Sequence, residues 1–406
     1  MKKMIAAVIA LTAIAGLAFP ADNWPNFNGP KLDNISTDKG LLKTWPSEGP
    51  SLLWKFDKAG KGYSGVSVVD GTIYIAGDFE EDCRVMALDM DGKVKWEAVA
   101  GGPWNSSYPG TRATPTYSNG LVYYMNANGE INAFDAKTGD VKWTTNIVVK
   151  LKGRKGGWGY AESLIVDGNN LLVLPGGPDI LMAALDKKTG KQVWTTPNSI
   201  GEVASYCTPN IVEFNGKKQI LTMSQKSVLS IDAKNGALLW SAPHKTNYDV
   251  NATSPVMYNG YVYVTSGYGV GNDCYLIAKG SKSVTKAWST KSMDNHHGGV
   301  VCLDGYVYGA GDKAWFCIDM KTGKDMWEDR GVGKGSVTYA DGMLYTMSER
   351  GKVGLVEASP KAFTMASSFQ LPKESNDPFW AHPVVIGGRL YIRHDQNLYV
   401  FNVKAK

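Results

Sequence analysis

Side chains able to bind ions or transfer protons recur just before a series of short apolar segments in this 406-residue chain. These positions read Tyr63-Ser64, Arg112-Ala113-Thr114, Tyr160-Ala161-Glu162, Tyr206-Cys207-Thr208, Asn251-Ala252-Thr253, His296-His297, Lys334-Gly335-Ser336 and Ala381-His382. The types present could hold a hard cation through carboxylate and amide oxygens, a transition metal through imidazoles, or an anion through a guanidinium or ammonium group.

Each of these groups also has a simpler interpretation. Ser, Thr and Tyr side chains around a narrow, wet channel commonly satisfy backbone groups and bound water. His296 and His297 could join His382 in a metal site, but histidines in such positions are more often hydrogen-bonded structural groups. We therefore predict no metal site. No serine, cysteine or paired-carboxylate catalytic arrangement follows from sequence order, so we assign no catalytic residue.

A repeated phrase identifies the elements that carry these residues. A hydrophobic strand is followed by Asp, a short turn, Gly, and Trp four residues later, with a period of roughly 40–50 residues typical of solenoids and propellers. The copies run from Asp89 to Trp96, Asp135 to Trp143, Asp186 to Trp194, Asp232 to Trp240 and Asp319 to Trp327. Asp and Gly favour a tight hairpin, and Trp is large enough to wedge between neighbouring sheets.

A second signature sets the number of repeats. A Gly two residues before an apolar strand recurs at positions 71, 120, 168, 216, 260, 305, 342 and 388. Trp288 serves the fifth unit, and Phe369 replaces Trp in the seventh. The last strand, 398–401, has no docking Trp after it, whereas Trp54 has no preceding strands of its own. We predict an all-β, eight-bladed β-propeller of four-stranded antiparallel blades, closed by pairing the N-terminal and C-terminal strands.

The repeat from Ala133 to Trp143 resembles that of pyrroloquinoline-quinone-type propellers, the quinoprotein alcohol dehydrogenase-like superfamily that includes the propeller lipoprotein of outer-membrane assembly. The opening Asn23-Trp24-Pro25-Asn26-Phe27-Asn28-Gly29-Pro30 resembles exported bacterial members. For the dehydrogenases, the resemblance implies calcium held by Glu162 and Asn251, with Arg112 or Lys334 facing pyrroloquinoline quinone. Without a cofactor, Glu162 would be a solvated carboxylate or a partner of Arg112.

Several features depart from the dehydrogenase pattern. The chain has five cysteines but no adjacent pair, no Asp precedes the inner strands to act as a base, and the loops are spare. We therefore expect a non-catalytic binding or scaffold propeller without a cofactor. The alternative is a quinoprotein oxidoreductase acting on an alcohol or sugar with pyrroloquinoline quinone and calcium.

The N-terminus predicts export. Lys2 and Lys3 precede an apolar run too short for a confident membrane span, so residues 1–21 are expected to be a cleaved signal peptide and residues 22–406 a single propeller domain. No cysteine stands at the cleavage region for a lipid anchor. The net charge of +5 and the absence of a basic block argue against nucleic-acid binding. We expect a periplasmic or secreted protein.

Three aromatic loops lead into innermost strands and predict a binding face for a protein, peptide or polysaccharide. Trp104, Trp158 and Trp380 each lie in such a loop and should form one arc around the mouth of the channel. The alternative is that each Trp folds over its own blade as a lid. The remaining predicted ligand-binding residues are Arg112, Tyr160, Tyr206, His296, His297 and His382.

Overall fold

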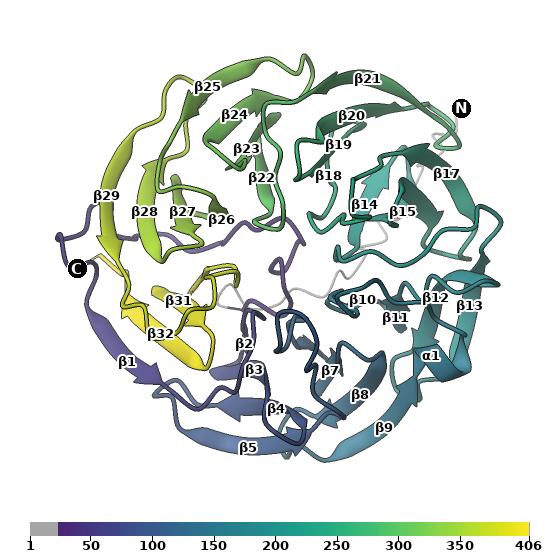
Figure 1. The fold of residues 1–406 in the computed structure, drawn as a ribbon, viewed down its shortest axis with the longest axis horizontal. Helices are drawn as coiled ribbons and strands as arrows, with labels where there is room; N and C mark the ends of the chain where they lie inside the picture. Colours follow the sequence, from purple (N-terminus) through teal and green to yellow (C-terminus); the bar gives the residue numbers. More distant parts are fainter. Residues whose placement is uncertain (1–22, 406) are drawn as a thin grey trace, which may run out of the picture.

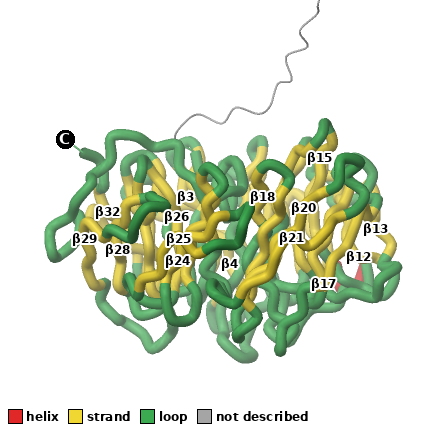
Figure 2. Tube along the Cα trace, turned by 90° about the horizontal axis from the view of Figure 1, so that it is seen from above, coloured by secondary structure: helices red, strands yellow, loops and turns green. Residues whose placement is uncertain are grey.

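Eight antiparallel sheets surround a central axis in the computed structural model, which describes residues 23–405 (Figure 1). Each sheet has four strands, and three hairpins of consecutive strands build every blade except the eighth. Seen edge-on, the strands form a middle layer with loops at both faces (Figure 2). The prediction of an all-β, eight-bladed propeller is confirmed. Residues 1–21, the predicted signal peptide, lie outside the described residues.

The first four blades contain β2 to β17. Their strands are β2 (Ser67–Val69), β3 (Thr72–Asp78), β4 (Cys83–Leu88), β5 (Val94–Val99), β6 (Thr116–Ser118), β7 (Leu121–Met125), β8 (Glu130–Asp135), β9 (Val141–Asn146), β10 (Ile165–Asp167), β11 (Asn170–Val173), β12 (Ile180–Asp186), β13 (Gln192–Pro197), β14 (Asn210–Phe214), β15 (Lys217–Met223), β16 (Ser227–Asp232) and β17 (Leu238–Pro243). A short helix, α1 (Ile147–Lys150), follows β9 and is capped by the Asn146 side chain.

The last four blades contain β18 to β32 and the first strand of the chain. Their strands are β18 (Val256–Tyr258), β19 (Tyr261–Ser266), β20 (Gly271–Ile277), β21 (Val284–Thr290), β22 (Val300–Leu303), β23 (Tyr306–Ala310), β24 (Trp315–Asp319), β25 (Asp325–Asp329), β26 (Gly335–Ala340), β27 (Met343–Ser348), β28 (Lys352–Glu357), β29 (Met365–Gln370), β30 (Val384–Ile386), β31 (Arg389–His394), β32 (Asn397–Asn402) and β1 (Leu52–Phe56). Strand β1 pairs antiparallel with β32, with Trp54 opposite Val400, so the predicted closure is confirmed.

The docking tryptophans join neighbouring blades through the turn glycines. Gly139 has a φ of 79°, and a Cβ there would lie 2.8 Å from the Trp96 ring of the preceding blade. The Trp96 indole N–H donates to the Ala136 carbonyl at 3.0 Å. The same packing places Trp54 on Gly92, Trp143 on Gly190, Trp194 on Gly236 and Trp288 on Gly323. The recurring Asp, Gly and Trp therefore encode contacts within and between blades.

Arg393 on β31 joins the eighth blade to the first. Its side chain is buried, and its guanidinium donates to the Ser64 hydroxyl, to the Gly60 carbonyl at 2.9 Å and to the Ala76 carbonyl at 2.5 Å. A buried cation is tolerated when its N–H groups have hydrogen-bond acceptors. These hydrogen bonds hold the inner part of the closure between the eighth and first blades, while the pairing of β1 with β32 holds its outer part.

The segment before β1 crosses the central axis. Trp24 bridges to Val68 of the first blade, and Ile35 bridges to Tyr339 of the seventh. Figure 1 shows this purple segment running from the middle of the ring towards its rim. It therefore obstructs one side of the channel.

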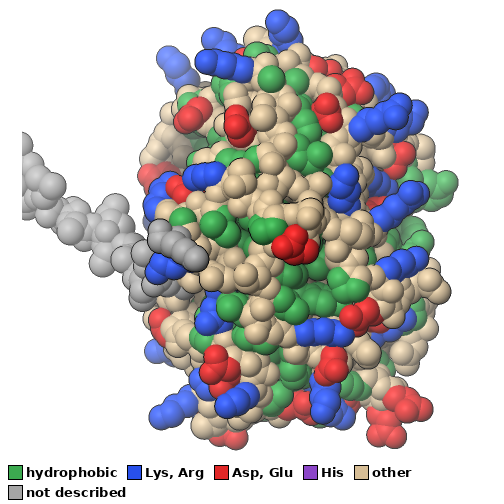
Figure 3. Space-filling model, turned by 90° about the vertical axis from the view of Figure 1, so that its left-hand side faces the viewer, with side chains coloured by type: hydrophobic (Ala, Val, Ile, Leu, Met, Phe, Trp, Pro, Cys, Tyr) green, Lys and Arg blue, Asp and Glu red, His purple; other side chains and the backbone are tan. Residues whose placement is uncertain are grey.

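Charged side chains of both signs are interspersed on the face drawn in Figure 3, without a block of one sign. Within residues 23–405, no helix is long and apolar enough to cross a lipid bilayer.

Candidate ligand-binding site at the channel mouth

A cavity of about 290 Å³ lies where the chain leads into the innermost strands. Its wall includes Tyr63, Trp158, Tyr206, Tyr268 and Trp380. Phe27, from the segment that crosses the axis, also contributes to the lining and stacks on His382 with 4.6 Å between ring centroids. Residues from many blades and from the N-terminal segment thus meet in one aromatic pocket.

The structure brings most of the predicted ligand-binding residues together. The cavity is lined by Arg112, Trp158, Tyr206, His296, His297, Trp380 and His382. Their common position before an innermost strand explains this convergence, because a propeller directs those strand starts towards its axis.

Trp104 and Tyr160 do not line the cavity. Trp104 is only 8% exposed, and its indole N–H donates to the Ser107 carbonyl at 3.1 Å. Tyr160 is buried, and its hydroxyl donates to the Pro175 carbonyl at 3.0 Å. Tyr160 therefore packs inside the fold, whereas Trp104 lines a separate hollow and carries Arg112 over its ring.

The aromatic wall is a connected set of rings. Trp380 contacts Tyr63, Tyr108 and His297, with centroid separations of 5.0, 4.9 and 4.7 Å. Trp158 packs edge-on against Tyr206 at 5.9 Å. Aromatic side chains have few rotatable bonds and lose little conformational entropy on binding. The wall is thus largely formed before a ligand arrives.

Arg112 supplies positive charge beside this wall. Its guanidinium donates to the carbonyls of Ser107, Tyr108 and Gly110, at 3.1, 2.8 and 2.6 Å. None of the ion pairs found in residues 23–405 involves Arg112. Burial lowers its pKa from the ordinary value, but a guanidinium stays protonated at neutral pH. The cavity therefore has a cation without a paired carboxylate.

The three histidines of the cavity all have a lowered pKa. Burial lowers the pKa of His296 to about 3 and that of His382 to about 4, and it also lowers the pKa of His297. His382 Nε2 lies 2.9 Å from the His297 carbonyl oxygen, so this nitrogen carries the proton and donates.

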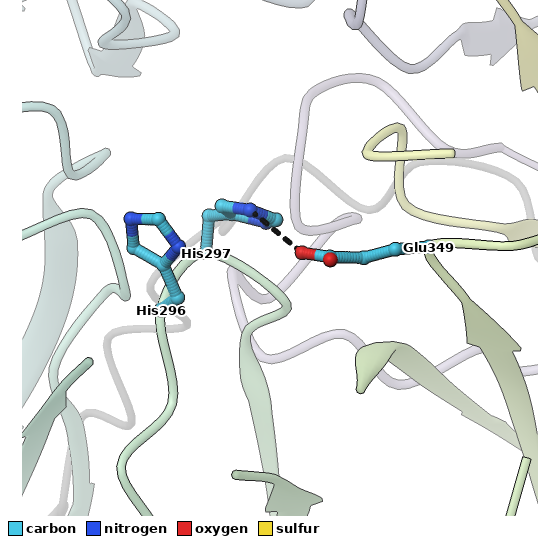
Figure 4. A group of neighbouring side chains, drawn as sticks. All are labelled: His296, His297 and Glu349. Atoms are coloured by element: carbon cyan, nitrogen blue, oxygen red, sulfur yellow. Dashed lines mark ion pairs between the residues drawn. The ribbon is translucent and has the colours of Figure 1, made fainter. Parts of the chain in front are cut away.

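Glu349, which sequence reasoning missed, lies beside the histidines. It directly follows β27, at the end of a strand, whereas the predicted site residues lie before innermost strands. Its Oε1 lies 3.2 Å from His297 Nε2 (Figure 4). The same oxygen accepts from the Trp380 indole N–H at 3.0 Å. Burial acts to raise the pKa of Glu349, but His297 and Lys334 outweigh burial and keep it below its ordinary value.

Asn251 does not have the free amide that the calcium role requires. It is fully buried, and its amide N–H groups donate to the carbonyls of Ser224, Gln225 and His244, at 2.9, 3.0 and 3.2 Å. Its Oδ1 accepts from the Ser266 hydroxyl at 2.5 Å. The amide therefore joins the chain that enters the fifth blade to loops of the fourth blade.

Glu162 and Lys334 are also directed elsewhere. Glu162 is 2% exposed and outside the cavity lining, and one carboxyl oxygen accepts from the Leu174 amide at 3.1 Å. The Lys334 ammonium is ion-paired with Asp312 at 3.2 Å. Of the four residues named for the cofactor, Arg112 reaches the cavity wall. This arrangement does not fit the calcium and quinone roles implied by the resemblance.

Two kinds of relative match this sequence. An outer membrane protein assembly factor BamB from Burkholderia pseudomallei (strain K96243) is 31% identical over 199 residues, covering 46% of this chain and 47% of the relative. The dehydrogenase subunit of an alcohol dehydrogenase (quinone) from Gluconobacter oxydans (strain 621H) is 30% identical over 188 residues, covering 41% of this chain and 23% of the relative. The chain thus matches about half or less of these proteins.

A solved structure supports the fold independently. The quinohemoprotein alcohol dehydrogenase from Comamonas testosteroni superposes with a TM-score of 0.69 at 12% identity, covering 95% of this chain and 81% of that one. The family model described as outer membrane protein assembly factor BamB matches residues 46–154 and 152–329. Because these matches span most of the propeller, the chain belongs to this family of quinoprotein-like repeat proteins.

Proposed function

We propose that this protein is an exported, non-catalytic binding propeller that captures a segment of a protein partner in the cavity at the channel mouth. The observation that carries the proposal is the combination of an aromatic wall with the Arg112 guanidinium, which has no carboxylate partner among residues 23–405. Such a site favours a ligand that offers both a flat apolar group and a negative charge.

The size of the cavity suits a short element of a partner. About 290 Å³ is near the lower end of the range of small-molecule pockets, roughly 300–1,000 Å³. One or two side chains would fill it, with a carboxylate directed at Arg112 and a ring or aliphatic group against Trp158 and Trp380. The rest of the partner would lie on the surrounding loops.

The family supports a protein as the partner class. The matching relative from Burkholderia is named as an assembly factor of outer membrane proteins. A periplasmic location and a cleaved leader over residues 1–21 remain part of this proposal. A sugar polymer, which also stacks on aromatic rings, is the competing ligand class.

A peptide selection tests the proposal. Random peptides enriched on the wild-type protein should share an acidic residue or free carboxyl terminus next to an aromatic or aliphatic residue. Calorimetry should then show at least about tenfold weaker binding for Arg112→Gln and for Trp380→Ala, because each removes one of the two recognition elements. The matched control is Val149→Ala, a residue 73% exposed and outside the cavity lining.

Two outcomes would contradict the proposal. The first is enrichment of peptides that bind Arg112→Gln and Trp380→Ala as tightly as wild type. The second is saturable binding of oligosaccharides in the same cavity without any peptide binding. Thermal unfolding of each variant separates lost binding from lost folding.

The second candidate is a quinone-dependent oxidoreductase. It is favoured by the similarity to the Gluconobacter alcohol dehydrogenase subunit and by the position of Arg112 in the cavity wall. Calorimetric titration with pyrroloquinoline quinone and calcium tests it directly. Micromolar or tighter binding that Glu162→Gln abolishes would favour this candidate over a binding propeller.

A further inference from the structure

We infer that His296, His297 and Glu349 form a binding site for a divalent transition-metal ion, with zinc as the best-suited ion, at the edge of the aromatic cavity. One ligand atom from each residue lies within 4.8 Å of the other two. Figure 4 shows the His297 ring between His296 and the Glu349 carboxylate. This inference does not depend on which partner the cavity binds.

The donor set matches the chemistry of such ions. Two imidazoles and one carboxylate are a common ligand set for zinc and other first-row divalent ions, whereas calcium and magnesium prefer oxygen ligands alone. In a tetrahedral zinc site with bonds of about 2.0–2.2 Å, ligand atoms lie roughly 3.4 Å apart. His297 Nε2 and Glu349 Oε1 are already 3.2 Å apart. Small side-chain rotations therefore suffice to complete the set.

The ligand atoms are available. In the part of the chain that the structure describes, the His296 ring contacts the rings of Tyr268 and His297, and no hydrogen bond uses its nitrogens. The Nε2 atom of His297 is buried and has no hydrogen bond of good geometry, despite its proximity to Glu349. The Trp380 indole N–H donates to Glu349 Oε1, and no hydrogen bond or ion pair among the described residues involves Oε2.

The backbone presents both histidines from a braced loop. The Asn295 amide donates to the Gly299 and Ala310 carbonyls, at 3.1 and 2.7 Å. A Cβ at position 298 would lie 1.8 Å from the Gly335 carbonyl oxygen, so only glycine allows the loop to approach the seventh blade. His382 donates to the His297 carbonyl at 2.9 Å. A metal site requires this kind of support around its ligands.

The Lys334 ammonium disfavours metal binding at this site. Its ammonium lies 3.8 Å from Glu349 Oε1, but it is also 3.2 Å from Asp312. It competes with an ion for the Glu349 carboxylate, and Asp312 draws it away. Replacing Lys334 should therefore strengthen metal binding, an effect opposite to that of removing a ligand.

The position of the metal site beside the cavity indicates a role for the ion in ligand binding. Three protein ligands leave at least one coordination position for a further ligand. His296 and His297 both line the cavity, so this position would be reached from the cavity. A carboxylate or other anionic group of a bound partner could coordinate there.

Titration of the apo protein with Zn²⁺ and with Co²⁺ tests the inference. We expect one ion per chain with micromolar or tighter affinity, and visible absorption of Co²⁺ typical of four or five ligands. His296→Ala and Glu349→Gln should each weaken binding by at least about tenfold, the lower end of what even outer partners of a metal site contribute. Lys334→Gln should tighten it. Glu374→Gln, on an exposed pair with Lys55, is the matched control and should bind as wild type.

The inference is overturned if neither ion binds below the millimolar range, or if the ligand variants bind as tightly as the control. Folding is checked by thermal unfolding of each variant. Glu349→Gln keeps an oxygen for the Trp380 N–H and should fold even if a histidine variant does not. Lys334→Gln provides a result that misfolding cannot imitate, because it predicts a gain of affinity.

Discussion

Glu162 predicts an unusual dependence of stability on pH. The side chain is 2% exposed, one carboxyl oxygen has the Leu174 amide as its donor, and the other has no partner among the described residues. Burial raises the pKa of Glu162 to about 8, from an ordinary value of 4.5. Between these two values, the folded chain keeps a proton that the unfolded chain releases. The free energy of unfolding should therefore fall as pH rises through this window.

The size of the effect follows from the two pKa values. Each tenfold difference in proton affinity corresponds to about 1.36 kcal/mol, so the cost of Glu162 should reach about 5 kcal/mol above pH 8. Glu162→Gln removes the titrating group and keeps its shape and its acceptor for Leu174. The variant should resemble wild type near pH 4 and be progressively more stable than wild type towards pH 8.

Urea unfolding of both proteins at a series of pH values measures this difference. Other acids with a raised pKa, such as the half-buried Asp33, whose pKa burial raises to about 6, contribute equally to both proteins and cancel in the comparison. Glu357→Gln, at an exposed position, is the control and should not change the pH profile. A constant stability difference between wild type and Glu162→Gln from pH 4 to pH 8 would refute the argument.

Three further perturbations test the architecture. Deleting residues 396–406 removes β32 and the partner of β1, so it should lower the melting temperature sharply, and an unchanged transition would disprove closure. Arg393→Met removes the donor of the Gly60 and Asp395 carbonyls and should cost roughly 3 kcal/mol or more in urea unfolding, whereas a loss below 1 kcal/mol would show that the closure of the ring does not need these bonds. Gly139→Ala should destabilise the protein more than Gly120→Ala, because both strain a positive φ but only Gly139 faces the Trp96 ring; equal losses would contradict the docking model.

The fold could be predicted from sequence because its determinants are local and repeated. The turn that contains Asp135 and Gly139 specifies a hairpin within one blade, and Trp96 specifies where the preceding blade docks. The same repeat pattern located the split eighth blade, because no inner strands precede Trp54 and no Trp follows the last strand. The radial direction of the inner strands then placed Arg112 and His382 at the mouth.

The details of the site depend on contacts that such patterns do not encode. Trp104 and Trp158 both lie in glycine-containing loops, yet the backbone N–H of Trp104 donates to the Asp78 carboxylate at 2.9 Å and holds this residue away from the cavity. Asn251 has the right type for a calcium ligand, but nearby carbonyls occupy its amide. Glu349 lies at a strand end, where the repeat gives no signal. Residue type and blade position predicted which residues lie near the mouth. The direction of each side chain depends on tertiary contacts.

The N-terminal segment explains why the mouth is a pocket on this propeller. Phe27 contributes to the lining, and the segment is fixed to distant blades by the bridges of Trp24 to Val68 and Ile35 to Tyr339. The match to the family model begins at residue 46, so this segment lies outside the matched repeats. The ring supplies most of the lining and its charged group, while the segment adds Phe27. The shape of this cavity therefore depends on the N-terminal segment as well as on the eight blades.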